Sequence, residues 1–200
     1  MHKGRLEAFS DGVLAIILTI MVLEIKVPHG ADFAALKPLL PTVLSYVLSF
    51  IYIGIYWSNH HMMLAGTNRI SGGILWANLH LLFWLSLVPF ATGWMGENHF
   101  ARATLVVYGV VLLMAGLAYL IMQNCIIAIE GPNSVLAHAI GRDLKGKSSG
   151  PLYAAGIAAS FWNPWVAGGI YIGVALMWLI PDRRIERTLA ASEAELKKVK

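Results

Sequence analysis

The chain has 200 residues, of which 15 are Lys or Arg and 11 are Asp or Glu, so it carries a modest positive net charge. Apolar residues make up 58% and charged residues only 13%, about half the share that is usual in soluble domains. This composition excludes a disordered chain, a basic nucleic-acid-binding domain and an ordinary cytosolic enzyme. The single cysteine, Cys125, excludes an intrachain disulfide and a cysteine-based zinc site.

Five apolar blocks follow one another along the chain, and a membrane-spanning helix needs about 20 such residues. The blocks cover residues 9–25, 39–57, 74–94, 100–128 and 152–180. Pro89 is expected to kink the third. Asn163-Pro164 interrupts the last block, which forms either one kinked helix or, with a turn there, a short fifth helix over residues 148–163 and a sixth after it. The fifth helix is short for a full crossing, so a re-entrant segment is an alternative. In the sixth, Gly169-x3-Gly173 predicts a close helix contact.

The distribution of basic residues sets the number of spans. With six spans, most Lys and Arg residues lie on the side of the N-terminus, whereas five spans would move the basic cluster after residue 182 to the opposite side. The positive-inside rule therefore favours six transmembrane helices with both termini in the cytoplasm. We expect an all-α membrane protein, with residues 1–181 forming the six-helix transmembrane domain and residues 182–200 a charged cytoplasmic helix or tail. Residues 130–150 are expected to include a short surface helix.

Polar side chains stand where the first helix enters the membrane, namely Arg5, Ser10 and Asp11. Ionisable residues at membrane depth are costly and often mark a functional site, although a simple helix cap would also explain Ser10 or Asp11. A helical wheel turns Asp11 away from the apolar face of the helix. We therefore expect its carboxylate to point into the bundle, toward histidine, asparagine and tryptophan donors of the second and third helices.

One face of the first helix forms a stripe of branched aliphatic residues. At about 100° per residue the following share a line along the helix: Arg5, Phe9, Gly12, Ile16, Ile20, Leu23 and Val27. Thr19 lies beside this line and adds one hydroxyl. Most apolar helix faces pack against lipid or a protein core, and lining a pore is the alternative.

Two motifs carry a resemblance to a known family. Arg5-x3-Phe9-Ser10-Asp11 at the start of the first helix, with Trp57-x2-His60-His61 after the second, resembles the transmembrane protein 175 family in its bacterial single-repeat form. The likeness covers essentially the whole chain. It implies a homotetrameric potassium channel of the bacterial cytoplasmic membrane that has no cofactor and no enzymatic activity. It also implies a channel fold without a carbonyl selectivity filter, and this sequence contains no Thr-Val-Gly-Tyr-Gly segment.

The resemblance also assigns roles to residues. It places the apolar constriction of the pore at Ile16, Ile20 and Leu23, on first helices that surround the pore axis. Thr19 matches a hydroxyl that some members place one turn past the first constriction, and a potassium ion is expected near it. By the same resemblance the signature residues Arg5, Phe9, Ser10 and Asp11 tie the first helix to its neighbours, with Trp57 and His60 as the partners.

Two other interpretations stay open at this stage. A proton-coupled transporter would use Asp11, His60 and His80 as a relay, and a bis-histidine haem site would use His60 and His80. No glycine-rich phosphate loop, His-Glu-x-x-His motif or nucleophile elbow occurs in the sequence, so we expect no enzyme.

Overall fold

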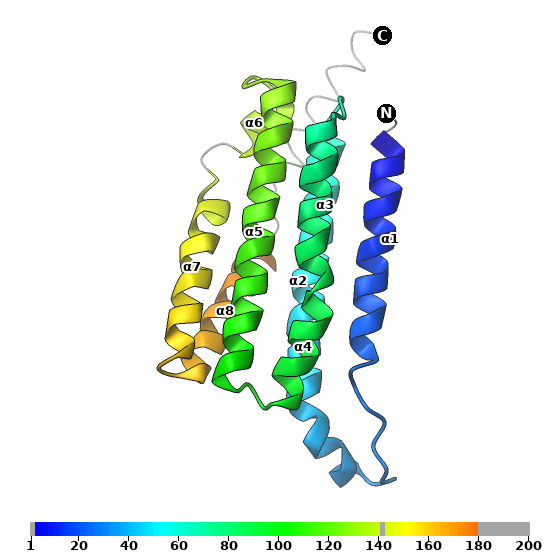
Figure 1. The fold of residues 1–200 in the computed structure, drawn as a ribbon, viewed down its shortest axis with the longest axis vertical. Coiled ribbons are helices and arrows are strands. Elements are labelled where there is room, and N and C mark those ends of the chain that lie inside the picture. The colour runs from blue at the N-terminus through cyan, green and yellow to red at the C-terminus, as the bar shows by residue number, and fades with distance from the viewer. Residues whose placement is uncertain (1–2, 141–142, 180–200) are drawn as a thin grey trace.

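The computed structural model describes residues 3–140 and 143–179, and the regular elements in these ranges are all helices (Figure 1). They are α1 (Lys3–Val22), the 3-10 helix η1 (Phe33–Leu39), α2 (Leu40–Ala65), α3 (Gly72–Ser86), α4 (Val88–Glu97), α5 (Arg102–Glu130), α6 (Val135–Ile140), α7 (Leu144–Ser160) and α8 (Pro164–Leu179). The expected all-α fold is confirmed. The tail expected over residues 182–200 lies outside the described residues.

Within the described residues six helical rods run along the long axis of the bundle, because α3 and α4 together form one rod. The break between them falls at Leu87, just before Pro89. Proline lacks an amide hydrogen and its ring crowds the carbonyl four residues earlier, so the expected kink is a break between two helices. The rods are α1, α2, α3–α4, α5, α7 and α8, in agreement with the expected six.

The rods differ in how well they match a bilayer. Three helical stretches are long and apolar enough to cross a membrane by length and composition: Phe33–Ala65, Gly72–Glu97 and Arg102–Glu130. The rod α1 carries charged residues in its first turns, and α7 and α8 have only 17 and 16 residues. The fifth helix is therefore short, as expected. The turn expected at Asn163-Pro164 is confirmed, since the Asn163 side chain accepts a hydrogen bond from the Trp165 amide at 2.9 Å.

Two predicted helix ends are wrong, and both affect residues of interest. The second helix continues to Ala65, because neither glycine nor proline occurs between Trp57 and Gly66, so Trp57 and His60 lie inside α2 and not after it. The first helix ends earlier than expected, at Val22, and Leu23 lies in the turn that follows. Pro28 follows closely, and a proline disfavours helical geometry in the residue before it.

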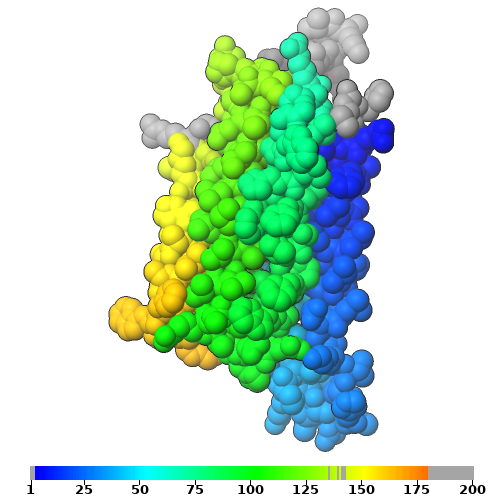
Figure 2. Space-filling view, viewed as in Figure 1, coloured from blue at the N-terminus to red at the C-terminus, as the bar shows by residue number. Residues whose placement is uncertain are grey.

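The helix α1 forms one edge of the bundle, and α7 with α8 forms the other (Figure 1). In the space-filling view α1 lies along the right edge over its full length (Figure 2). On its inner side α1 contacts α2, α3 and α4. The core between α2, α5, α7 and α8 is built around tyrosines, of which Tyr52, Tyr108 and Tyr171 are fully buried.

Glycines allow the closest helix contacts in this core, but not the pair that the sequence suggested. A Cβ atom added at Gly109 would lie 2.0 Å from the Tyr171 hydroxyl, and one at Gly156 would lie 2.4 Å from the Tyr171 ring. Gly169 and Gly173 are exposed, and a Cβ atom added at either meets nothing within 4 Å in the described chain. The contact predicted for Gly169-x3-Gly173 is therefore wrong within one chain.

Candidate functional site

The helix α1 has two unlike faces. Its inner face is buried against the neighbouring helices by Leu6, Ser10, Leu14, Ile17 and Met21. The opposite face carries the aliphatic stripe, and the exposed fractions of its side chains are 58% at Ile16, 43% at Ile20 and 76% at Leu23. Thr19 is exposed on the same side. The chain therefore leaves a continuous row of large apolar side chains uncovered along one helix.

The hydroxyl of Thr19 is turned back onto its own helix. Its Oγ1 atom donates to the carbonyl oxygen of Ala15 or Ile16, at 3.0 Å and 2.9 Å. A threonine hydroxyl has one hydrogen and two lone pairs, so this arrangement uses the hydrogen and leaves lone pairs facing outward. The exposed surface of α1 thus offers one oxygen acceptor among aliphatic groups.

Asp11 lies at the surface of the chain, between α1 and α2, and not inside the bundle as the helical wheel suggested. The indole Nε1 of Trp57 donates to Asp11 Oδ1 at 3.0 Å, and both side chains are exposed. The Trp57 ring stacks on His61 with the ring centroids 6.1 Å apart. The carboxylate is therefore held by a tryptophan that belongs to the second motif of the sequence.

A second, fully buried set of hydrogen bonds joins α1, α2 and α3. The amide of Asn78 contacts Ser10 Oγ, with the Asn78 Nδ2 atom at 3.0 Å, and its Oδ1 atom lies 2.7 Å from His60 Nε2. Ser10 also donates to the Leu6 carbonyl at 2.9 Å. Asn78 is one of the asparagine donors expected on the second and third helices, and the sequence alone does not single it out. The signal for its role was an amide in the middle of an otherwise apolar span.

The other two signature residues do not join these contacts. Arg5 and Phe9 are exposed on the outer side of α1. Near them Lys3 donates to the carbonyl oxygen of Ala65 at 3.2 Å, which ties the start of α1 to the end of α2. The structure therefore brings Ser10 and Asp11 to α2 and α3, and leaves Arg5 and Phe9 on the free face.

The far end of α1 is held by α4, through contacts that sequence reasoning did not identify. Lys26 forms an ion pair with Glu97, and this hydrogen bond raises the pKa of Lys26 above its usual value. Glu24 packs against Gly93 so closely that a Cβ atom there would lie 2.7 Å from a Glu24 carboxylate oxygen. Leu23, at the end of the stripe, directly precedes these anchors.

The histidines are engaged separately. His80 Nε2 accepts a hydrogen bond from the Trp84 indole at 3.0 Å, on the same helix, while His60 Nε2 is bonded to Asn78. The Nε2 atoms of both histidines are therefore in hydrogen bonds to different partners. Within residues 3–140 and 143–179, no three His, Cys, Asp or Glu side chains are grouped to hold a metal ion.

The chain is similar to known channel proteins. The sequence model of the family described as endosomal/lysosomal potassium channel TMEM175 matches residues 5–89. A potassium channel of Chryseobacterium sp. (strain P1-3) is 57% identical over 94% of this chain and 98% of its own length. A potassium channel of Chamaesiphon minutus is 32% identical over 90% of this chain and 94% of its own. The crystal structure of a lysosomal potassium-selective channel TMEM175 homolog from Chamaesiphon minutus superposes with a TM-score of 0.80 at 28% identity, covering 90% of this chain and 97% of that one.

Proposed function

Because this chain belongs to the TMEM175 family of membrane channels, we propose that it forms a potassium-selective cation channel with α1 lining the pore. The observation that carries this proposal is the uncovered aliphatic stripe of α1, which holds Ile16, Thr19, Ile20 and Leu23 on one side. In a single chain this row has no partner. In an assembly this row would line a central pore and restrict ion passage, whereas contact with lipid would give the row no such role.

The pore requires several copies of the chain, because one helix cannot enclose an axis. We propose a homotetramer in which four α1 helices surround the axis and their inner faces stay packed on α2, α3 and α4. The crystal structure of the Chamaesiphon minutus homolog supports this fold for each subunit, with a TM-score of 0.80. The exposed signature residues Arg5 and Phe9 then lie near the mouth of the pore or against a neighbouring subunit.

Rings of isoleucine and leucine at the axis would control conduction by excluding water. An apolar constriction dries out easily, and an ion that crosses it loses part of its hydration shell without replacement. Potassium holds its water less tightly than sodium, so its barrier is lower. A barrier difference of about 1.4 kcal/mol corresponds to a tenfold difference in rate. This filter needs no backbone carbonyls and no bound cofactor.

A ring of Thr19 hydroxyls would add oxygen ligands for the permeant ion. Since each hydroxyl hydrogen is donated to the α1 backbone, the lone pairs remain for a cation. We propose that a potassium ion pauses near Thr19, next to the ring of Ile16 or Ile20. The contacts of Asp11 with Trp57, and of Ser10 and His60 with Asn78, would then fix the rotation of α1 that presents these residues to the axis.

The alternative of a proton-coupled transporter receives less support. A relay through Asp11, His60 and His80 needs the three groups in one hydrogen-bonded chain. In the described residues Asp11 bonds Trp57, His60 bonds Asn78, and His80 bonds Trp84. We also propose that the protein lies in the bacterial cytoplasmic membrane, by its similarity to bacterial channels. The distribution of Lys and Arg supports both termini in the cytoplasm.

Bi-ionic flux in proteoliposomes tests the proposal. The purified protein is reconstituted with potassium inside and sodium outside, and then with the gradients reversed. A channel gives fast, non-saturating flux that favours potassium in both arrangements. Flux that appears only with an imposed proton gradient and saturates would instead support the transporter and overturn the channel.

A further inference from the structure

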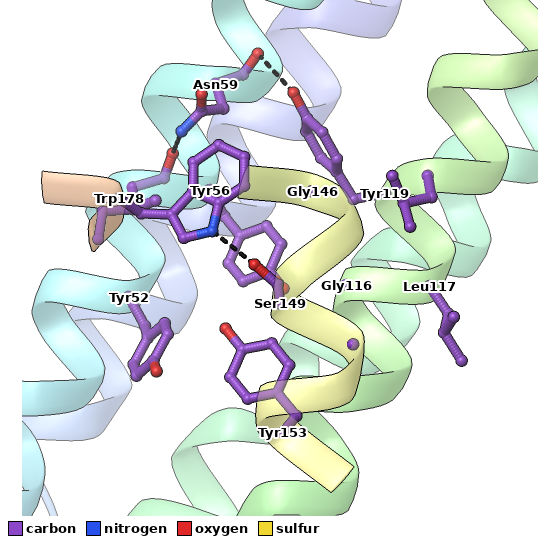
Figure 3. A pocket seen from close by; sticks show the side chains of 13 residues that line it. Tyr52, Tyr56, Asn59, Gly116, Leu117, Tyr119, Gly146, Ser149, Tyr153 and Trp178 are labelled. Carbon is purple, nitrogen blue, oxygen red and sulfur yellow. Dashed lines mark hydrogen bonds between the residues drawn. The ribbon is translucent and has the colours of Figure 1, made fainter. Parts of the chain in front are cut away.

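A cavity of about 50 Å³ lies inside the bundle, between α2, α5, α7 and the end of α8 (Figure 3). Aromatic side chains form much of its wall: Tyr52, Tyr56, Tyr119, Tyr153 and Trp178. The space exists because small residues face it, Gly116 on α5 and Gly146 and Gly150 on α7. None of the residues that line it carries a formal charge. Neither the conduction path nor the α1 contacts use this cavity.

A groove between α2 and α8 leads to the cavity. It has a volume of about 320 Å³ and shares Ile55, Asn59 and Trp178 with the cavity wall. Its other walls include Phe50, Ile51 and Met62, which are residues of an apolar helix long enough to cross a membrane. Among the described residues, this groove therefore adjoins the cavity on an apolar side of the bundle.

Most polar groups in the cavity wall already have partners. The Tyr52 hydroxyl donates to the Tyr171 carbonyl at 2.6 Å, and the Trp178 indole donates to Ser149 Oγ at 2.8 Å. Tyr56 differs. Its side chain is only 9% exposed and its ring meets Tyr119 edge-on, yet no group in the described part of the chain hydrogen-bonds its hydroxyl. No fully buried side-chain nitrogen or oxygen of the described residues lacks a partner, so this hydroxyl borders the open space and is available to an occupant of the cavity.

The position of α2 connects the cavity to the pore helix. Tyr56 and Asn59 line the cavity, while their neighbours Trp57 and His60 face the other way and hold α1 through Asp11 and Asn78. An occupant that shifts or stiffens this part of α2 therefore acts on the helix that carries the aliphatic stripe. This coupling rests on the proposed channel function, whereas binding to the cavity does not.

We propose that the cavity and its groove bind a small, neutral aromatic molecule with one hydrogen-bonding group, of the indole or phenol class, which enters from the membrane and modulates conduction through α2. The absence of charge in the wall favours a neutral ligand, and the aromatic side chains favour a ring that meets them edge-to-face. The Tyr56 hydroxyl supplies the polar contact. A lipid acyl chain would fill the same space but leave that hydroxyl unpaired.

Binding is measured with 5-fluoroindole by fluorine NMR, on the full chain in lipid nanodiscs. Gly116→Leu fills the cavity, since its Cβ would lie 3.6 Å from the Tyr153 ring, an ordinary contact, and the rest of the side chain enters the space. Gly173→Leu is the matched control, on an exposed site of α8 with nothing within 4 Å of its Cβ. We expect the bound signal to disappear in the first variant and to persist in the control.

A second variant decides the result if Gly116→Leu does not fold. Tyr56→Phe keeps the shape of the wall and removes one hydrogen bond, so affinity should fall about fivefold. Unchanged binding in Tyr56→Phe, or in a folded Gly116→Leu, would overturn the site. Binding of 5-fluoroindole in detergent that is lost in nanodiscs would also overturn the site, because lipid acyl chains would then be the occupant.

Potassium flux with and without saturating 5-fluoroindole tests the coupling separately. We expect flux to change in the wild type and to be insensitive to the ligand in Gly116→Leu. Equal flux with and without ligand would refute modulation while leaving the binding result intact. A wild type that conducts no potassium under any condition would refute the proposed function, and the NMR result would still stand.

Discussion

The indole nitrogen of Trp57 on α2 donates a hydrogen bond to a carboxylate oxygen of Asp11 on α1, across 3.0 Å. Hydrogen bonds to charged groups contribute about 1.5–3 kcal/mol, and less where water competes. Because both side chains are exposed, we expect Trp57→Phe to lower the free energy of unfolding in detergent by about 1 kcal/mol, below that range. Thermal unfolding of the variant measures this loss. Trp76→Phe, at a side chain that is 75% exposed, is the control and should change little.

Ile20→Asn should wet the apolar constriction. An amide in the ring stabilises water there and lowers the barrier for both cations, most for the ion that loses the most hydration. A decrease of about 1.4 kcal/mol raises flux about tenfold, so we expect sodium flux to rise by at least about that factor. Reconstituted Ile20→Val, which keeps the ring apolar, should retain the wild-type preference. An unchanged permeability ratio in Ile20→Asn would remove this residue from the pore.

Variants of Thr19 test how much of the potassium preference comes from its hydroxyl and how much from the aliphatic rings. Thr19→Val keeps the shape of the side chain and removes the oxygen ligand, so we expect the preference for potassium over sodium to fall. Thr19→Ser keeps the hydroxyl and should preserve it. Reversal potentials under bi-ionic conditions measure both. Equal ratios in the two variants would assign selection to the aliphatic rings alone.

Gly109→Ala tests the contact between α5 and α8. The added Cβ would lie 2.0 Å from the Tyr171 hydroxyl, which is itself held by a hydrogen bond to the Leu105 carbonyl at 3.1 Å. Overpacking of this kind costs about 1–3 kcal/mol. Thermal unfolding in detergent should show that loss for Gly109→Ala and none for Gly173→Ala. Equal stability of both variants would mean that α8 does not pack on α5 as described.

The ion pair of Lys26 with Glu97 gives stability a specific dependence on pH. The pKa of Lys26 is raised from 10.5 by its hydrogen bond to Glu97. A raised lysine pKa contributes stability that is complete below the unfolded value and disappears as the pH rises through the folded value. Lys26→Met should therefore be less stable than the wild type near neutral pH and equal to it well above pH 10.5. A stability difference that grows with pH would contradict the assignment.

The sequence was sufficient for features that depend on periodicity or local signals. The six rods follow from five apolar blocks, the Asn163-Pro164 turn and the distribution of basic residues, and the uncovered face of α1 follows from the spacing of Ile16, Ile20 and Leu23. The direction of Asp11 could not be predicted, because a helical wheel gives its angle to Ile16 but not which neighbour stands there. Trp57 reaches it from 46 positions away.

Other features depend on residues that only the folded chain brings together. Lys26 and Glu97 are 71 positions apart, and neither carries a local signal of pairing. The aromatic cavity collects side chains from α2, α5, α7 and α8, each of which looks like ordinary core in its own helix. The end of α1 was misplaced because hydropathy continues through Leu23 and Ile25, whereas the helix itself ends at Val22.

Because of the break at Leu87, α1 is held by two separate helices, α3 and α4. The N-terminal half of α1 is bonded to α3 through Asn78, and the segment after its C-terminal end is bonded to α4 through Glu97. A straight helix in place of α3–α4 would transmit any tilt from one attachment to the other. With a proline break between them, a tilt of α4 would reach only the C-terminal attachment while Ser10 and Asn78 stay in register, so in the proposed pore the two ends of α1 would be held independently.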